Sequence, residues 1–221
     1  MSTPASMQSG IAPTAGSPFG TMTLALVLAV WLFAVSLLGA RGAFIGAPGA
    51  PPLALLIAFA APLFVFSIAL RASGAFRAFA LGLDPRALLA MQAWRFTGFE
   101  FLALQAHAIL PAYFAWPAGL GDMAIGLTAP LMLTVLNRRP EFASSKGFVV
   151  WNLLGVLDLV VAVSLGAVGS FLMGRADTTI TTAPMAGMPL VLIPTFLVPL
   201  FLMMHITALL QARHRARVVH A

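Results

Sequence analysis

Six long apolar segments, separated by short polar or basic stretches, constrain this chain more than any other feature of its sequence. They cover about residues 21–40, 52–70, 86–110, 118–136, 148–168 and 188–210. A helix needs about 20 apolar residues to cross the hydrocarbon core of a bilayer. Only 8% of the residues are charged, whereas soluble domains carry about 25%. The sequence therefore predicts an all-α integral membrane protein with six transmembrane helices.

The remaining chain divides into two tails and one additional short helix. Residues 1–20 contain no Lys or Arg, so they lack the basic start of a secretory signal and read as a disordered cytoplasmic tail. Residues 21–212 form the transmembrane domain, and residues 213–221 form a basic cytoplasmic tail. Between Arg71 and Arg86, apolar residues recur at helical spacing, which predicts a short interfacial helix between the second and third spans. Asp84 and Pro85 form a helix-start signal for the third span.

Two further features concern the later spans. The aromatic segment 111–117 is predicted to be a tight connection at headgroup level between the third and fourth spans. The sixth span carries Pro189, Pro194 and Pro199, each of which removes a backbone hydrogen bond. We expect a bent sixth helix, and bent helices can line cavities in transporters.

The distribution of Lys and Arg predicts the orientation, because cytoplasmic loops near span ends are enriched in these residues. Two basic residues, Arg41 and Arg175, fall on one side. Nine fall on the other: Arg71, Arg77, Arg86, Arg138, Arg139, Lys146, Arg213, Arg215 and Arg217. This predicts a bacterial inner (cytoplasmic) membrane protein with both termini in the cytoplasm.

Ionisable residues inside the apolar segments are the candidates for function, because each costs about 2.5 to 3.5 kcal/mol at mid-membrane. We expect a polar intramembrane site at mid-depth made of Arg95, Glu100, Asp158 and His205. Arg95 and Asp158 lie at similar depths, so Arg95 can pair with Asp158 or with Glu100. On a regular helix Gln92, Arg95, Glu100 and His107 share one face, which is expected to point inward.

A second group, His107 and Asp122, lies near the outer surface at adjacent ends of one predicted hairpin. These residues are candidates for an outer mouth or a proton entry. The alternative is structural, since Asp122 lies near the start of the fourth span, where free backbone donors stabilise a carboxylate. Gly119 and Gly126 flank Asp122, and such small residues let another helix approach closely.

Several classes of chemistry find no support in the sequence. There is no cysteine, so thiolate nucleophiles and Cys-ligated metals are excluded. His107 and His205 lie at different depths and cannot hold one haem from both sides, and no phosphate loop or zinc-protease motif is present. We expect no cofactor, no metal and no catalytic residues, and we expect the basic residues to serve topology rather than nucleic-acid binding.

The leading hypothesis is a small-solute or proton-linked transporter, a channel or a ligand-binding membrane protein. The first alternative is a non-catalytic scaffold or assembly component whose buried charges only order the bundle. The second is an intramembrane enzyme or redox protein, which the missing motifs disfavour. The expected partners are membrane lipid, a small solute or proton, and another membrane protein or a second copy of the chain.

Overall fold

The computed structural model describes residues 18–47, 50–169 and 180–219, and these residues form helices and turns with no β-strand among them. The predicted disordered tail lies almost wholly outside the described residues. The long helices are α1 (Pro18–Ala40), α2 (Leu53–Ala72), α6 (Ala112–Arg138), α7 (Lys146–Val168) and α8 (Val198–Val219). The short ones are α3 (Gly74–Gly82), α4 (Pro85–Gln92), α5 (Phe99–Ala106), the 3-10 helices η1 (Ala93–Gly98), η2 (Pro140–Ser144) and η4 (Ala183–Ala186), and the π-helical turn η5 (Ile193–Leu197). The all-α prediction is confirmed.

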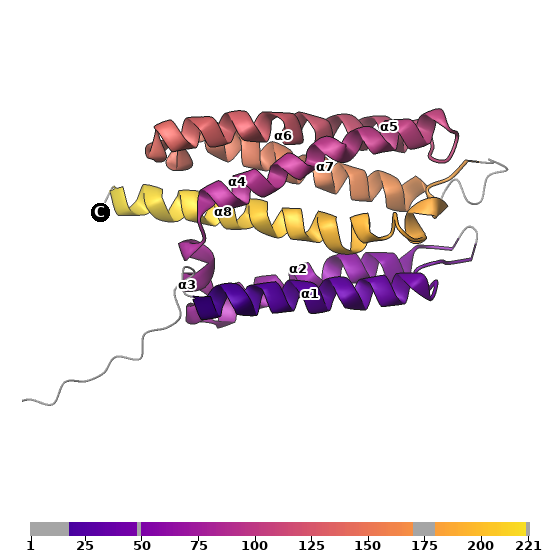
Figure 1. Cartoon of the computed structure of the whole chain (residues 1–221), viewed down its shortest axis with the longest axis horizontal. Coiled ribbons are helices and arrows are strands. Elements are labelled where there is room, and N and C mark those ends of the chain that lie inside the picture. The colour runs from indigo at the N-terminus through magenta and orange to yellow at the C-terminus, as the bar shows by residue number, and fades with distance from the viewer. Residues whose placement is uncertain (1–17, 48–49, 170–179, 220–221) are drawn as a thin grey trace, which may run out of the picture.

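Five of these helices are long and apolar enough to cross a membrane: Gly20–Ala40, Leu53–Ala72, Ala112–Arg138, Lys146–Val168 and Ile193–Arg217. The third predicted span is different. It is divided into α4, η1 and α5, although the composite segment still runs alongside α6 (Figure 1). The 3-10 turn has 3.0 residues per turn and the α-helix 3.6, so the six residues of η1 rotate the following face by about 120°.

That rotation overturns the expected inward face of the third span. Gln92 and Arg95 are buried, with 1% and 2% of their surfaces exposed. Glu100 and His107, which follow η1, are both exposed. The expectation that these four residues share one face is therefore wrong, because it assumed a continuous α-helical period.

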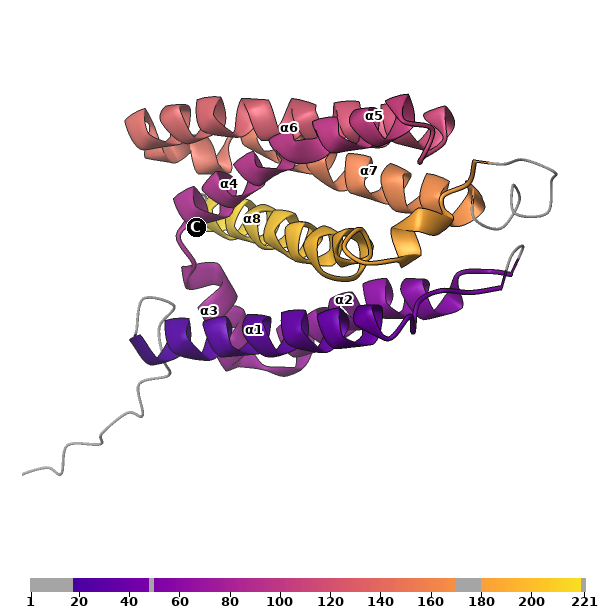
Figure 2. The ribbon, with the colours of Figure 1, turned by 45° about the vertical axis from the view of Figure 1, so that its right-hand side comes forward.

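The helices form a bundle in which α8 lies between two groups. On one side are the α4–η1–α5 segment, α6 and α7, and on the other are α1 and α2 (Figures 1 and 2). The most extensive packing is between α6 and its neighbours η1, α5 and α7. Two apolar clusters fill this region, one around Leu89 and Phe148 and the other around Phe101 and Phe114.

Two segments differ from the predicted boundaries. The aromatic connection 111–117 is not a loop: Pro111 caps α6, whose first two turns contain Tyr113, Phe114 and Trp116. Proline at the start of a helix lacks only a hydrogen bond that the first turn does not make. In the sixth segment, Pro194 lies in the π-helical turn η5 and Pro199 near the start of α8, so regular helix begins later than predicted. Helix α8 also continues to Val219, through most of the predicted basic tail.

The short helix between α2 and α4 is present as predicted. The Ser73 hydroxyl accepts a hydrogen bond from the Phe76 amide at 3.1 Å and caps α3. The Asp84 carboxylate accepts one from the Arg86 amide at 2.9 Å, with Pro85 in the first turn of α4. These caps explain why the chain can restart a helix twice within a few residues.

The outer surface of the bundle is strongly apolar. Phe33 on α1, Phe64 on α2 and Leu127 on α6 are all more than half exposed. Soluble monomers seldom expose contiguous apolar patches beyond a few hundred Å². The described helices therefore present large apolar side chains on their outer faces.

The helix order places the predicted basic side at one end of the bundle. Arg71 ends α2, Arg138 ends α6 and Arg217 lies in the last turn of α8, while Arg86 and Lys146 lie in the first turns of α4 and α7. These helix ends lie at the same end of the molecule as the start of α1 (Figure 1). We call it the basic end.

Candidate functional site

The side chain of Arg95 lies at the centre of the bundle and contacts three helices. Its Nε donates a hydrogen bond to Asp122 Oδ1 on α6 at 2.7 Å, and its Nη2 donates to Asp158 Oδ2 on α7. Its Nη1 lies 3.0 Å from His205 Nε2 on α8 and 3.5 Å from the carbonyl oxygen of Gly155. We call these residues, Arg95, Asp122, Asp158 and His205, the Arg95 cluster.

The hydrogen-bond pattern specifies the tautomer of His205. Because an arginine only donates, His205 Nε2 must accept from Arg95 and therefore carries no proton. The opposite ring nitrogen, Nδ1, lies 2.9 Å from Asn152 Oδ1 and donates to it. The Asn152 amide in turn donates to the carbonyl oxygen of Phe148 at 2.9 Å. A directed chain of hydrogen bonds thus runs from Arg95 through α8 back to α7.

Glycines on α6 and α7 make room for the cluster. A Cβ on Gly121 would collide with the carboxylate of Asp158, and one on Gly155 would collide with the ring of His205. A Cβ on Gly126 would meet the backbone of η1. At Gly119 it would lie 2.9 Å from the carbonyl oxygen of Gly98. The expectation that small residues beside the aspartates allow close approach of another helix is confirmed.

The structure brings together only part of the predicted sites. It places Arg95, Asp158 and His205 in contact, as the mid-depth site requires. Glu100 is exposed and forms no ion pair within the described residues, so Arg95 pairs with Asp158 and not with Glu100. His107 is exposed at the end of α5.

Asp122 lies elsewhere than expected. It was predicted to lie with His107 at an outer mouth, but its carboxylate contacts Arg95 in the centre of the bundle. The reason is that α6 begins earlier than predicted, so Asp122 lies three turns into the helix rather than in its first turn. The stabilisation expected from free amides at a helix start therefore does not apply to it.

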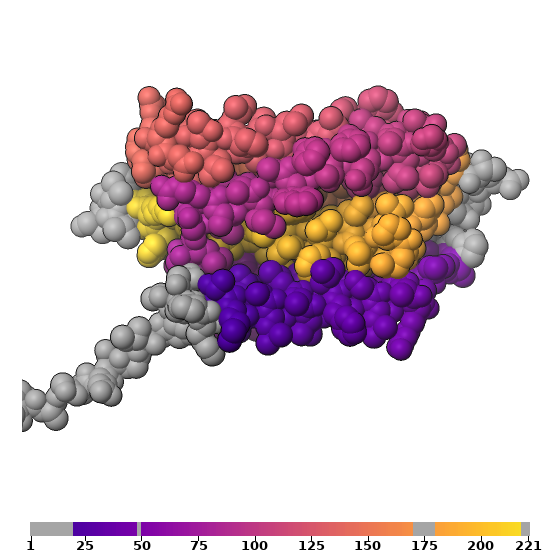
Figure 3. Space-filling view, viewed as in Figure 1, coloured from indigo at the N-terminus to yellow at the C-terminus, as the bar shows by residue number. Residues whose placement is uncertain are grey.

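A cavity of about 270 Å³ lies against the Arg95 cluster, between the α4–η1–α5 segment and the η5–α8 segment. Its charged lining residues are Arg95, Glu100 and Asp122. Exposed Trp94 and Leu197 stand at its edge, and Phe101, Phe196 and Phe201 line it further in. The surface is recessed between these segments (Figure 3). We call this the central cavity.

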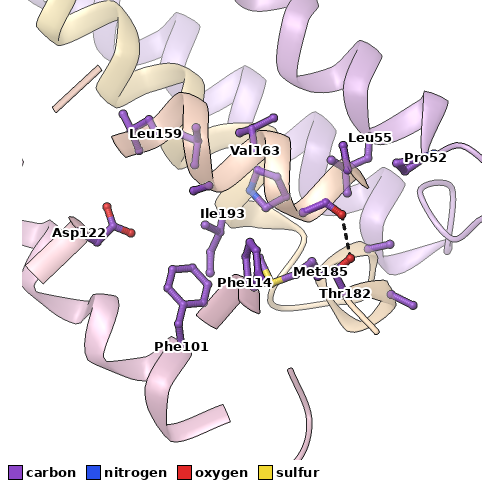
Figure 4. Close-up of a pocket in the computed structure, with 17 residues that line it drawn as sticks. Pro52, Leu55, Phe101, Phe114, Asp122, Leu159, Val163, Thr182, Met185 and Ile193 are labelled. Carbon is purple, nitrogen blue, oxygen red and sulfur yellow. Dashed lines mark hydrogen bonds between the residues drawn. The ribbon is translucent and has the colours of Figure 1, made fainter. Parts of the chain in front are cut away.

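A smaller cavity, of about 70 Å³, adjoins the central one towards the end opposite the basic end. Phe101, Asp122, Leu159, Ile193 and Val198 line both cavities. Asp122 is the one charged residue among the described residues that line the smaller cavity, and Figure 4 shows it at one edge of an otherwise apolar space. We call this the outer cavity.

The far side of the outer cavity is lined by residues of the segment 182–186. Thr182 donates a hydrogen bond to the carbonyl oxygen of Gly166 at 2.8 Å, which fixes this segment against the end of α7 (Figure 4). Met185, from η4, packs beside Phe101 and Phe114.

Residues 52–213 match a family model described as Domain of unknown function (DUF8737). The chain belongs to this family. The DUF8737 segment contains the whole Arg95 cluster and nearly all of the described helices, whereas α1 precedes it. No curated protein and no solved structure matches the chain.

Sequence reasoning left two contributors out of the site: Gly121, and Asn152, which the sequence predicts to mark the inner interface of the fifth span or to hydrogen-bond to a neighbouring span, as it does to His205. A signal for Asn152 was present, because it lies three residues before Gly155 on the face of α7 that also carries Phe148 and Leu159. No comparable signal marked Gly121. Its role depends on the register between α6 and α7, which only the three-dimensional packing reveals.

Proposed function

We propose that the chain is a multi-pass inner-membrane protein of six spans, with the α4–η1–α5 segment as the third span and both termini in the cytoplasm. Two features support this: the apolar outer surface and the basic end. Because η1 is a tight turn rather than a loop, its backbone donors and acceptors remain satisfied within the segment. The composite segment can therefore cross the apolar core as a continuous helix would.

Fusions to alkaline phosphatase test this topology, because the enzyme folds only outside the cytoplasm. Fusions after Arg41 and Tyr113 are expected to be active, and fusions after Arg77 and Arg139 inactive. Activity after Arg139 would reverse the proposed orientation. Equal activity on both sides of the α4–η1–α5 segment would show that this segment does not cross.

Given this topology, we infer that the protein binds a small amphipathic cation and transports it across the membrane in exchange for protons. The observation that carries the inference is the composition of the central cavity: two carboxylates, several aromatic rings and an opening among exposed apolar residues. Carboxylates attract a cation, and aromatic faces stabilise it further.

The bonding of Arg95 argues against an anionic solute. Asp122, Asp158, His205 and Gly155 occupy its Nε, Nη1 and Nη2 groups. The Arg95 cluster contains two carboxyl groups for one guanidinium group, and Glu100 adds a third carboxyl group to the cavity. Excess negative charge in a site of low polarity favours a proton or a cationic ligand.

The position of Asp122 connects the site to a route. It lines both the central and the outer cavity, so a cation leaving the central cavity towards the outer end passes this carboxylate. Glu100 is the carboxylate best placed to exchange a proton for the cation, because it lines the cavity and forms no ion pair within the described residues.

The test uses benzyltrimethylammonium and neopentylbenzene, its uncharged carbon isostere, with protein reconstituted in phosphatidylcholine nanodiscs. We expect saturable binding of the cation and roughly tenfold weaker binding by Glu100→Gln, equal to about 1.4 kcal/mol. The matched control is Glu141→Gln, which changes an exposed carboxylate outside both cavities. In proteoliposomes, an outward proton gradient should drive uptake of the cation by wild-type protein and not by Glu100→Gln.

Three results would contradict the inference. Equal binding of the cation and its neutral isostere would show that charge does not select the ligand. An equal loss of cation affinity in Glu100→Gln and Glu141→Gln would show that the cation does not bind in the central cavity. Binding without proton-driven uptake would leave a ligand-binding protein and refute transport.

One observation favours a second candidate, a non-catalytic membrane component. The Arg95 cluster joins η1 to α6, α7 and α8, and so many interhelical hydrogen bonds suit a group that orders the bundle. In that case the charges can be replaced together without loss of function, and no cation would bind.

A further inference from the structure

The third cavity of the molecule lies at the basic end and has a different chemistry from the central and outer cavities. It has a volume of about 490 Å³ and lies between α2, α3 and the last turns of α8. Figures 1 and 2 show α3 bridging the layer that contains α2 and the layer that contains α8. We call it the basic cavity.

Four arginines line the basic cavity: Arg71 from α2, Arg77 from α3, and Arg213 and Arg217 from α8. His214 completes its set of ionisable residues, and no carboxylate is present among the described lining residues. All four arginines are exposed, and the ion pairs of the described chain involve only Arg86 and Arg95. Positive charge from three helices therefore converges, and no counterion for it lies among the described residues.

The walls of the basic cavity are held in place by contacts that the arginines do not make. The buried Gln211 amide donates to the carbonyl oxygens of Ala80 at 3.1 Å and Leu83 at 2.8 Å, which ties α8 to α3. The rings of Phe66 and Phe76 meet edge to face, with centroids 5.9 Å apart, and tie α2 to α3. The cavity is thus preorganised, and bringing the arginines together requires no ligand.

The deeper wall of the basic cavity is apolar. Leu70, Leu81, Ile206 and Leu210 line it, all half-buried. Leu70 precedes Arg71 on α2, and Ile206 and Leu210 precede Arg213 and Arg217 on α8, so the arginines stand nearer the helix ends than this wall. A ligand that fits both parts has an anionic head and an apolar body.

We propose that the basic cavity binds the phosphate headgroup of an anionic phospholipid, with an acyl chain against the apolar wall. Arginine guanidinium groups bind phosphate oxygens with two parallel hydrogen bonds. Basic pockets between transmembrane helices on the cytoplasmic side are suited to such headgroups. This proposal is independent of the cation site, which lies elsewhere in the bundle.

The test measures lipid binding by native mass spectrometry of the full-length protein in an uncharged detergent. The probes are dioleoyl phosphatidylglycerol and dioleoyl phosphatidylcholine, which share their acyl chains and differ in headgroup charge. The variant is Arg77→Gln/Arg213→Gln. The matched control is Arg138→Gln/Arg139→Gln, which removes two exposed arginines at the same end but outside the basic cavity.

We expect wild-type protein to bind phosphatidylglycerol tightly and phosphatidylcholine weakly. The cavity variant should bind phosphatidylglycerol about thirtyfold more weakly, which corresponds to about 2 kcal/mol. The control variant should change the affinity for phosphatidylglycerol less than threefold. All substituted arginines are exposed, and far-UV circular dichroism checks that the variants remain folded.

A competition experiment with inorganic phosphate distinguishes a phospholipid headgroup from free phosphate as the ligand of the basic cavity. At 10 mM, inorganic phosphate should not displace phosphatidylglycerol, because it lacks the apolar body. If phosphate at this concentration displaced phosphatidylglycerol, the ligand of the basic cavity would be free phosphate and not a phospholipid. Equal losses in the cavity and control variants would overturn the proposal, since a general surface charge would then explain the binding.

Discussion

Replacing Arg95 with methionine should destabilise the protein more than any other single substitution of a charged residue. Arg95→Met keeps an unbranched apolar side chain of similar reach but leaves Asp122 and Asp158 facing each other. Their side chains are only 16% and 12% exposed. Removing one partner of a buried ion pair costs about 3 to 5 kcal/mol.

The hydrogen bonds that are lost and the charge left behind both contribute to this cost, in comparable parts. Interhelical hydrogen bonds in membrane proteins average about 0.6 kcal/mol. Losing the bonds of Arg95 to its four partners would then cost about 2 to 3 kcal/mol. In Asp158→Asn, by contrast, Arg95 keeps Asp122 as its counterion, and we expect a loss of about 1 to 2 kcal/mol.

The assay is reversible unfolding by sodium dodecyl sulfate in mixed micelles, followed by circular dichroism. The matched control is Arg138→Met, an exposed arginine that should change the free energy of unfolding by less than 0.5 kcal/mol. The triple variant Arg95→Met/Asp122→Asn/Asp158→Asn removes all three charges and should recover part of the loss, up to about half.

Two results would refute the reasoning. A loss below about 1 kcal/mol in Arg95→Met would mean that the carboxylates do not depend on the guanidinium. A triple variant no more stable than Arg95→Met would show that lost hydrogen bonds, rather than unpaired charge, cause the instability. Full recovery in the triple variant, combined with no cation binding by the wild-type protein, would favour the structural role of the Arg95 cluster over transport.

Two further substitutions test how the site is built. Gly121→Ala places a methyl group against the Asp158 carboxylate. The overpacking cost is about 1 to 3 kcal/mol, and it opposes a gain in helix propensity of about 1 kcal/mol. We therefore expect the free energy of unfolding to fall in the same assay. Gly74→Ala, which meets nothing within 4 Å, should be neutral or stabilising, and equal behaviour of the two would contradict the packing. Asp84→Ala removes the hydrogen bond to the Arg86 amide and should cost about 1 kcal/mol, whereas an unchanged free energy of unfolding would show that this cap does not stabilise α4.

Much of the fold could be predicted because hydrophobic length and end signals are local properties. The apolar segments at 21–40, 52–70 and 148–168 match α1, α2 and α7 closely. Asp84 and Pro85 marked the start of α4 correctly. Helix boundaries failed at 111–117 and 188–197, where aromatic and proline residues allow a helix, a turn or a loop and tertiary packing selects among them.

The site was harder to predict because it depends on the direction in which the side chains of the α4–η1–α5 segment point, and this direction changes with the number of residues per helical turn. Depth arithmetic brought Arg95 and Asp158 to similar levels, and the structure places them in contact with each other and with His205. It could not supply the six residues of 3-10 helix in η1, which carry no proline and no distinctive pattern. That local change turns Glu100 away from Arg95 and leaves Asp122 as the second counterion.

The consequence for function follows from the same change of phase. On a continuous α-helix, Glu100 would share the face of Arg95 and could serve as one of its counterions. In the structure, η1 separates the two side chains, since every nitrogen of the Arg95 guanidinium is hydrogen-bonded to α6, α7 or α8, while Glu100 lines the central cavity and forms no ion pair within the described residues. The 3-10 turn is therefore the feature that creates an unpaired carboxylate beside an apolar cavity. For this reason Glu100, rather than the more deeply buried Arg95, is the residue on which the proposed cation exchange depends.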